Sequence, residues 1–190
     1  YGVKRLVFTS SSAIYGEADT PTTEEHSKNP MSPYALNKLI GEQYCKLYSE
    51  IYNLQTVCLR YSNVYGEGQP IEGAYCNVMG IFEQQKLMGK PMTIVGDGEQ
   101  RRDFIHVNDL IDALHILISE RQINGIIDIG SGTSHQITDL MKHFGIDFEG
   151  KIGGDNERLD NKANIELLTK YGWKTNYDLY KYIEEHRSVN

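Results

Sequence analysis

Residues 5–17, RLVFTSSSAIYGE, join a short apolar run to three consecutive serines and a Tyr-Gly pair. A short apolar run bounded by turn-forming residues is typical of a fully buried strand. Serine and glycine suit the turn that ends such a strand, because they supply local hydrogen bonds and a permissive backbone. Taken alone, this stretch fits a structural turn as well as a site that uses a serine hydroxyl.

The apolar runs that follow alternate with helical patterns. Further strands are predicted at residues 55–61, 92–96 and 125–130. Helices are predicted at residues 77–89, 107–121, 137–144, 162–172 and 179–187. The alternation of strands and helices predicts a parallel sheet flanked by helices.

A long helix is predicted at residues 29–53, where Ser32 suits the N-cap and Pro33 the first helical position. Tyr34 and Lys38 lie four residues apart, so both side chains project from one face of this helix. An ammonium beside a phenol stabilises the phenolate and lowers its pKa from about 10, as a tyrosine general base requires. Apolar side chains also repeat along one face at spacings of three or four: Leu36, Leu39, Ile40, Tyr44, Leu47 and Ile51.

The Tyr-Lys spacing is weak by itself, since Tyr177 and Lys181 match it too. We interpret this second pair as surface charge on a helix of the tail. Ser11 distinguishes the Tyr34–Lys38 pair from this second pair, because Ser11 lies at the end of a predicted strand. In a parallel sheet the strand ends and the helices that follow them converge on the carboxyl edge, where ligands bind. Ser11, Tyr34 and Lys38 are therefore a candidate catalytic triad.

Composition narrows the class of protein. The 190 residues, 39% of them hydrophobic, suit one sizeable core with room for a small lobe. The net charge of −7 makes nucleic acid and anionic membrane poor partners. No apolar run approaches the roughly 18 residues of a membrane span, and the first ten residues show no export signal. Three widely spaced cysteines fit a reducing cytoplasm, and neither they nor the six histidines have metal-site spacing.

Four stretches occur in order along the chain: FTSSSAIYG (8–16), SPYALNK (32–38), LRYSNVYGEGQ (59–69) and GDGEQRRDFIHVND (96–109). With them the sequence resembles the NAD-dependent nucleotide-sugar epimerases and dehydratases of the extended short-chain dehydrogenase/reductase superfamily. The resemblance covers nearly all of residues 1–175, and residues 176–190 are expected to form a C-terminal helix. It implies the C-terminal portion of a Rossmann-like, doubly wound α/β sheet, interleaved with a small α/β substrate-binding lobe.

The resemblance also implies roles for individual residues. Tyr34 would take a proton from a sugar hydroxyl while hydride leaves the same carbon for NAD, with Ser11 bonded to that hydroxyl and Lys38 holding the cofactor ribose. Implied cofactor contacts are Ser10, Tyr34, Lys38, Tyr61 and Ser62. Implied substrate contacts are Ser11, Asn63, Asn77, Val78, Arg102 and Arg158. No metal is implied.

Each substrate contact has a structural alternative. Asn63 also suits a turn after a strand, and Asn77 also suits a helix N-cap. Arg102 offers a planar guanidinium to a diphosphate, but a solvated surface arginine is its alternative. Arg158 is a weaker match, because the family often carries its second diphosphate arginine in a longer tail segment.

Other features are interpreted as structural. Gly130 and Gly132 lie between a strand and a helix, but His135 stands where the dinucleotide fingerprint has its third glycine. We therefore predict a structural turn there. His106 and His115 are expected to be packing or surface residues, and Asp97 and Gly98 to form an ordinary turn.

The family begins with a Gly-rich turn, followed about 20 residues later by an acidic residue that reads the ribose. No such motif precedes Tyr1. The 190 residues are therefore expected to be a piece of a longer enzyme, inactive alone, with an unpaired edge on the first strand. The complete enzyme is expected to be a homodimer, and the choice between NAD and NADP stays open.

The resemblance favours 4-epimerisation of a UDP-sugar through a 4-keto intermediate. The alternatives are a nucleotide-sugar 4,6-dehydratase, a heptose-type epimerase, or a non-catalytic relative that only binds nucleotide sugars. A dehydratase needs an acid-base group beside the Ser/Thr, usually a carboxylate. Ser12 and Ala13 stand there in this chain, which favours the epimerase. The base, the sugar and the carbon that is epimerised are left open.

Overall fold

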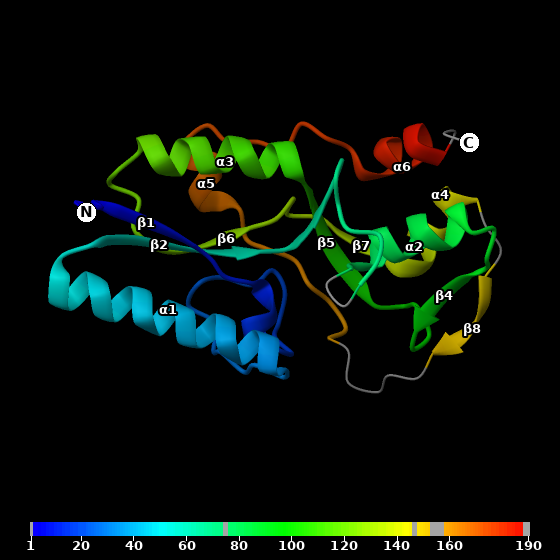
Figure 1. Cartoon of the computed structure of the whole chain (residues 1–190), viewed down its shortest axis with the longest axis horizontal. Coiled ribbons are helices and arrows are strands. Elements are labelled where there is room, and N and C mark those ends of the chain that lie inside the picture. Colours follow the sequence, from blue (N-terminus) through cyan, green and yellow to red (C-terminus); the bar gives the residue numbers. More distant parts are fainter. Residues whose placement is uncertain (1, 74–75, 146–147, 153–157, 188–190) are drawn as a thin grey trace.

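The computed structural model of the chain describes residues 2–73, 76–145, 148–152 and 158–187. Figure 1 shows a larger lobe, with a parallel sheet between helices, beside a smaller lobe of short strands and helices. None of the helices in the described ranges combines the length and the apolar character that crossing a bilayer requires.

The sheet of the larger lobe confirms the predicted parallel strands. Its order is β1 (Arg5–Thr9), β2 (Gln55–Tyr61) and β6 (Gly125–Ile129). In the register, Phe8 pairs with Cys58 and Leu59 with Ile127, all in parallel strands. Within the part of the chain that the structure describes, β1 pairs with β2 alone, so it is the edge strand that the sequence predicts.

Helices cover both faces of this sheet (Figure 1). α1 (Pro33–Tyr52) lies on one face, and α3 (Val107–Ser119) and α5 (Glu166–Lys170) lie on the other. The core between the sheet and α3 is buried and mostly aliphatic, as continuous apolar strands require. Its members include Val57, Leu59, Ile105, Leu117, Ile127 and Trp173.

α1 begins as predicted. The Ser32 side chain accepts a hydrogen bond from the backbone N–H of Ala35 at 3.1 Å, and Pro33 occupies the first turn. This cap fixes the start of the helix, because it satisfies one of the N–H groups that have no partner within the helix. Tyr34 is thereby placed in the first turn, at the carboxyl edge of the sheet.

The apolar repeat along α1 does not mark its buried side. Ala35, Glu42 and Cys45 are the buried residues of this helix. Five members of the repeat are 43 to 61% exposed: Leu36, Ile40, Tyr44, Leu47 and Ile51. The helix instead approaches β1 through Gly41, where an added Cβ would lie 2.2 Å from Cζ of Phe8. A close, narrow contact of this kind leaves the larger side chains on the open surface.

The smaller lobe contains two further sheets. β3 (Asn63–Tyr65) pairs in parallel with β5 (Arg101–His106), and β5 pairs antiparallel with β7 (Ser134–Gln136). β4 (Met92–Val95) pairs in parallel with β8 (Phe148–Ile152). The sequence predicts β4 but not β3, β5, β7 or β8, because these strands are short or polar and lack a continuous apolar run.

Three helices pack around these strands: α2 (Val78–Leu87), α4 (Ile137–Phe144) and α6 (Leu179–Arg187). They enclose a second core that includes Tyr65, Met79, Phe82, Phe104, Leu140, Phe144 and Ile183. The helix predicted within residues 176–190 is α6, and Leu179 and Ile183 bury it in this core. The C-terminal helix is therefore part of the smaller lobe.

Tyr177 and Lys181 do not share a helix face, because Tyr177 precedes α6. The Tyr177 ring stacks on the buried His106 ring, with 3.9 Å between centroids and 6° between planes. Lys181 forms an exposed ion pair with Glu185 at 3.7 Å. His106 is thus a packing residue, as predicted, and the second Tyr-Lys pair has no common site.

Candidate active site

Ser11 lies just beyond the carboxyl end of β1. It is the N-cap of a short 3-10 helix, Ser12–Tyr15, and its Oγ accepts a hydrogen bond from the backbone N–H of Ala13 at 3.2 Å. An accepting hydroxyl retains its own proton as a donor. The cap therefore fixes the position of Ser11 Oγ and leaves it able to bond a ligand.

Lys38 connects Tyr34 to the end of β1. Lys38 Nζ donates a hydrogen bond to the carbonyl oxygen of Thr9 at 2.7 Å. The same nitrogen lies 5.5 Å from the centroid of the Tyr34 ring. Tyr34 itself is 48% exposed, so its phenol is open to a ligand. The structure thus brings the three predicted catalytic residues to one edge of the sheet.

Ser11 and Tyr34 line the same cavity, of about 480 Å³, which we call the Ser11 cavity. Its lining combines the turn after β1, the start of α1 and the end of β2. Other lining residues include Ser12, Ala13, Tyr61, Ser62, Asn63, Arg102, Arg158 and Asn161. Of the described residues that line this cavity, none is Asp or Glu.

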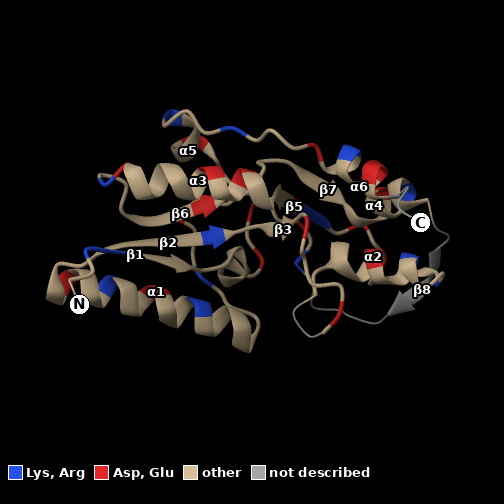
Figure 2. Ribbon diagram, turned by 45° about the horizontal axis from the view of Figure 1, so that its top comes forward, with Lys and Arg blue, Asp and Glu red and all other residues tan. Residues whose placement is uncertain are grey.

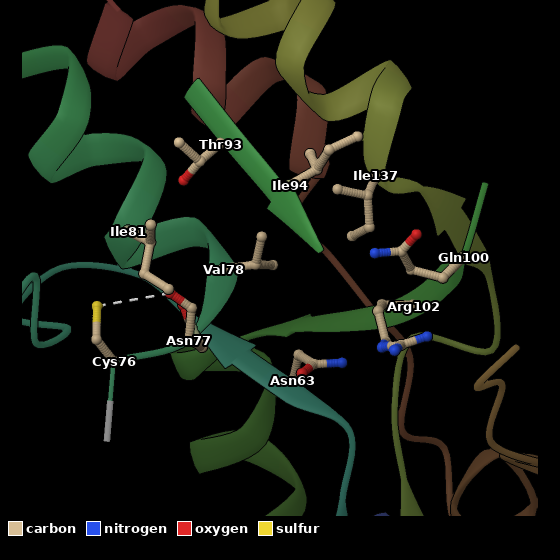
Figure 3. A pocket seen from close by; sticks show the side chains of 10 residues that line it. All are labelled: Asn63, Cys76, Asn77, Val78, Ile81, Thr93, Ile94, Gln100, Arg102 and Ile137. Atoms are coloured by element: carbon tan, nitrogen blue, oxygen red, sulfur yellow. Dashed lines mark hydrogen bonds between the residues drawn. The ribbon is translucent and has the colours of Figure 1, made fainter. Parts of the chain in front are cut away.

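A second cavity, of about 330 Å³, lies in the smaller lobe (Figure 3). We call it the Asn77 cavity. Arg102 and Gln100 lie on one side of it, and Asn77 and Ile81 on the other. Its lining is largely apolar and includes Val78, Thr93, Ile94 and Ile137. A mostly apolar pocket with a few polar groups is typical of a small-molecule site.

Asn63 and Arg102 line both cavities, which therefore adjoin each other. Arg102 Nη1 donates to the carbonyl oxygens of Arg101 and Arg158, at 2.9 and 2.6 Å. These contacts hold the guanidinium where the two cavities meet. The arrangement suits an elongated ligand whose middle part is anionic.

Arg158 lies beside Arg102 but lines only the Ser11 cavity. Its Nη1 donates to the carbonyl oxygen of Ser12 at 3.4 Å, whereas Nε and Nη2 are buried with no hydrogen-bond partner among the described residues. Burial lowers the pKa of the Arg158 guanidinium, and the nearby Glu17 opposes that shift. This second arginine adds positive charge at the junction.

Asn63 and Asn77 each have a structural role as well as a place in a cavity wall. Asn63 Nδ2 donates to the carbonyl oxygen of Asp103 at 3.0 Å. Asn77 caps α2, since its Oδ1 accepts from the backbone N–H of Gly80 at 3.0 Å and its Nδ2 donates to the carbonyl oxygen of Val64 at 2.7 Å. The N-cap alternative for Asn77 thus coexists with a position in the cavity, and its contact with a ligand stays a prediction.

The predicted cofactor contacts divide into two groups. Tyr61 and Ser62 line the Ser11 cavity beside Tyr34, and burial raises the pKa of Tyr61. Ser10 instead is buried, and its hydroxyl donates to the Glu42 carboxylate at 2.5 Å. Its side chain is engaged inside the protein, so its contact with a cofactor stays a prediction.

Asp103 was not predicted from the sequence; it follows Arg102 in the chain, and its carbonyl oxygen accepts the hydrogen bond from the cavity residue Asn63. This fully buried carboxylate accepts hydrogen bonds from the backbone N–H groups of Ser131, Gly132 and Ala163, at 2.7, 3.1 and 3.1 Å. A Cβ at Gly130 would lie 2.4 Å from Asp103 Oδ2, so only glycine fits there. The turn at residues 130–132 is thus structural, as predicted. A charged residue within the run RRDFIH was the available signal.

Asn161 was also missed. Its Nδ2 donates to Ser12 Oγ at 2.9 Å, and the residue lines the Ser11 cavity. Because 149 residues separate these two partners, no local spacing could reveal the contact.

Across the described ranges no group of His, Cys, Asp or Glu is arranged to hold a metal ion.

A sequence profile of the NAD dependent epimerase/dehydratase family matches residues 1–130. The chain belongs to this family. UDP-glucose 4-epimerase of Mycolicibacterium smegmatis is 40% identical to the chain over 189 residues, covering 91% of the chain and 58% of that protein.

Solved structures agree with the placement in the epimerase/dehydratase family. UDP-N-acetylglucosamine 4-epimerase from Methanobrevibacter ruminantium M1, in complex with UDP-N-acetylmuramic acid, superposes with a TM-score of 0.87 at 35% identity, over 97% of the chain and 62% of that structure. UDP-glucose 4-epimerase from Thermus thermophilus, in complex with NAD, gives 0.86 at 29% identity, over 100% and 66%. The chain thus spans less than two thirds of the length of these relatives.

The residues of this epimerase/dehydratase chain fit the nicotinamide end of NAD. An ammonium has three N–H donors, and the Thr9 carbonyl accepts one from Lys38. The remaining donors lie at the carboxyl edge of the sheet, beside a cavity lined by Tyr34, Tyr61 and Ser62. Ribose hydroxyls and a flat ring are suitable partners for such a set of groups.

Proposed function

We propose that the protein containing this chain is an NAD-dependent 4-epimerase of a UDP-sugar, acting through a 4-keto sugar. One observation carries the proposal: Ser11 and Tyr34 line one cavity, Lys38 lies beside Tyr34, and this cavity meets the Asn77 cavity at Arg102. The two cavities provide places for the sugar and for the nucleotide, and the guanidinium of Arg102 lies between them.

In this mechanism Tyr34 is the general base that removes the proton from the C4 hydroxyl of the sugar. Ser11 Oγ donates a hydrogen bond to the same oxygen and orients it. Lys38, held by the Thr9 carbonyl, keeps its ammonium beside the Tyr34 ring. Bound NAD supplies a reversible hydride acceptor. The 4-keto sugar then turns over in the cavity, and Tyr34 returns the proton to the C4 oxygen.

The substrate diphosphate is assigned to Arg102, whose planar guanidinium matches paired phosphate oxygens. The N–H groups of Arg158 reinforce this positive region, and Asn63 lies beside it on the shared wall. The nucleotide is assigned to the Asn77 cavity, where Val78 and Ile94 offer apolar contact to a base. The sugar then occupies the Ser11 cavity.

The cavity wall favours epimerisation over dehydration. A dehydratase must remove a proton next to the new ketone and protonate a leaving hydroxide, which requires acid-base groups near the sugar. Ser12 Oγ is engaged by Asn161, and Ala13 carries no polar group. Since none of the described lining residues is a carboxylate, the Tyr34 proton transfer is the acid-base step that this site supports. A heptose-type epimerase is the closest alternative, and a purely binding relative would not need Ser11, Tyr34 and Lys38 together.

The test is to incubate the complete enzyme separately with UDP-glucose, UDP-N-acetylglucosamine and dTDP-glucose, and to identify the products by chromatography and mass. We expect a C4 epimer of unchanged mass from at least one UDP-sugar. A product lighter by one water from any of them would contradict the epimerase, and so would the absence of turnover of all three.

We also propose that the complete enzyme is a homodimer and resides in the cytoplasm. The exposed apolar face of α1 suits a second copy of the same helix, because it presents several large side chains without charge. Cys45, Cys58 and Cys76 are free thiols, which suits a reducing compartment. Analytical ultracentrifugation of the complete enzyme, with Ile40→Glu and Tyr44→Glu as interface variants, tests the dimer.

A further inference from the structure

A buried ion pair lies beneath the candidate catalytic residues. Arg60, on β2, is fully buried and makes a bidentate contact with the carboxylate of Glu42, on α1. Arg60 Nε lies 2.9 Å from Glu42 Oε1, and Nη2 lies 2.6 Å from Oε2. These two hydrogen bonds hold the Arg60 guanidinium and the Glu42 carboxylate in one relative orientation. The pair thereby restricts the angle between α1 and β2.

The opposite side of Arg60 extends the network across the sheet. Arg60 Nη1 donates to the Tyr15 hydroxyl at 2.7 Å, and that hydroxyl donates to the Asp128 carboxylate at 2.8 Å. Asp128 lies on β6, and Figure 2 shows these charges within the sheet, blue near the end of β2 and red on β6. Tyr15 belongs to the turn that begins at Ser11, so the network holds that turn as well.

Ser10 connects this network to the catalytic edge. Its hydroxyl donates to Glu42 Oε1 at 2.5 Å, and its backbone N–H donates to the Leu59 carbonyl at 2.8 Å. Ser10 stands between Thr9, whose carbonyl holds Lys38, and Ser11, whose hydroxyl lines the cavity. A movement of Ser10 therefore moves both neighbouring contacts.

Tyr34, Lys38 and Glu42 follow one another at intervals of four residues and so form one stripe along α1. Lys38 bonds Thr9 and Glu42 bonds Ser10, which are adjacent residues at the end of β1. Two consecutive members of the stripe thus hold two consecutive residues of the strand. The third member, Tyr34, lines the same cavity as Ser11.

A buried ion pair is weak evidence for a stabilising role. A buried ion pair loses much of its attraction to the cost of removing both charges from water, and well-packed apolar residues are often at least as stable. What the pair supplies is a fixed geometry between a helix and a strand. That geometry lies directly behind the residues to which the chemistry is assigned.

We propose that Ser10 and Glu42 are positioning residues, which set the placement of Tyr34 relative to Ser11 by clamping α1 onto the end of β1. Arg60 orients the Glu42 carboxylate for this task. The inference deepens the proposed function, because it takes Tyr34 and Ser11 as the reacting groups. It gives Ser10 a role within the fold, through Glu42, in addition to the cofactor contact that stays a prediction.

Ser10→Ala is the test variant, because it removes the hydroxyl that joins β1 to Glu42 and leaves the Arg60–Glu42 pair in place. Thr56→Val is the matched control. Thr56 is also buried, and its Oγ1 donates to the Cys45 carbonyl at 3.3 Å, so it joins β2 to α1 three residues beyond Glu42. Ser10→Thr keeps the hydroxyl and serves as the rescue.

We expect Ser10→Ala in the complete enzyme to lower kcat by about 10- to 100-fold, the scale of a small misplacement of reacting groups, with little change in KM. Thr56→Val should leave kcat unchanged even where it lowers the melting temperature, and Ser10→Thr should restore most of kcat. If Ser10→Ala retains the kcat of the control, the proposal is overturned.

A second readout does not depend on turnover. In the same enzyme labelled with ¹³C-tyrosine, the Tyr34 ring resonance is identified by its loss in Tyr34→Phe. Ser10→Ala should shift or broaden this resonance, whereas Thr56→Val should leave it in place. If the parent enzyme converts no nucleotide sugar, the proposed function is wrong, and this resonance alone then decides the positioning role. An unchanged resonance in Ser10→Ala would refute it.

Discussion

Lys38 and Thr9 are joined by a 2.7 Å hydrogen bond from the lysine Nζ to the threonine carbonyl oxygen. Thr9 is the last residue of β1, and Lys38 lies one turn after Tyr34 on α1. The bond holds the ammonium beside the Tyr34 ring and close to the serines that follow β1. One side chain thus ties the helix, the strand end and the candidate base into a single unit.

Tyr34→Phe tests the base. Removing the phenol hydroxyl should lower kcat of the complete enzyme at least about 100-fold, the scale of a lost general base, with the protein still folded. Tyr177→Phe is the control, because Tyr177 stacks on His106 in the other lobe and the substitution keeps its ring. Comparable steady-state rates for the two variants would remove Tyr34 from the mechanism.

Arg102→Ala tests the diphosphate position. The loss of charged hydrogen bonds at the junction of the two cavities should weaken binding of the nucleotide sugar by roughly 1.5–3 kcal/mol and leave NAD binding unchanged. Isothermal titration calorimetry measures both affinities. Arg121→Ala is the control and should have no effect, because Arg121 is exposed and lines neither cavity. If the Arg102→Ala protein kept the parental affinity for the nucleotide sugar, Arg102 would be a surface residue that does not bind the diphosphate.

Asp128→Asn tests the buried network through pH. Burial raises the pKa of Asp128 to about 7, and the Tyr15 hydrogen bond opposes that shift. An unfolded aspartate titrates near pH 4, so between about pH 4 and pH 7 the folded protein retains a proton that the unfolded chain has released. The stability from that proton is complete below about pH 4 and is lost as the pH rises through 7.

Asparagine cannot ionise, so the unfolding free energy of Asp128→Asn relative to the parent should rise with pH across this window. The slope of the difference is at most about 1.4 kcal/mol per pH unit. Urea unfolding of both proteins from about pH 4 to about pH 8 provides the measurement. A difference that stays constant with pH would show that Asp128 does not titrate in this range.

Gly41→Ala tests the close approach of α1 to β1. Alanine favours a helix by about 1 kcal/mol over glycine, but here its Cβ would lie 2.2 Å from Cζ of Phe8. Overpacking typically costs about 1–3 kcal/mol, so the substitution should destabilise the protein on balance. In a Phe8→Ala background the same substitution should be neutral or stabilising. A double-mutant cycle with no coupling between the two sites would contradict this contact.

The elements that the sequence predicts well are those whose pattern follows from burial on both sides. β1, β2 and β6 need continuous apolar runs because helices cover both sheet faces, and α1 begins at a Ser-Pro cap that is local in sequence. The short strands β3, β5 and β7 carry polar residues and depend on partners far along the chain. Their pairing arises from tertiary contacts, which no local period contains.

The residues of the candidate site also fall into those that a local pattern predicts and those that only the fold brings together. Ser11, Tyr34 and Lys38 could be predicted as a candidate triad because two of them share a helix face and the third ends a predicted strand. Glu42, Arg60 and Asp128 were not found, because each belongs to a different element and only the fold brings them together. The exposed apolar face of α1 is the opposite case. Its apolar repeat is plain in the sequence and predicts burial, but a repeat does not identify the surface that covers it.

The most direct test of the account uses a UDP-sugar that carries deuterium at C4. The reaction proposed for Ser11, Tyr34 and Lys38 removes hydrogen from C4 as hydride and returns it to the same carbon on the opposite face. We therefore predict that the complete enzyme forms a C4 epimer of unchanged mass that retains the deuterium at C4, as shown by mass spectrometry and NMR. Loss of the deuterium to solvent, its appearance at another carbon, or a product lighter by one water would contradict the account.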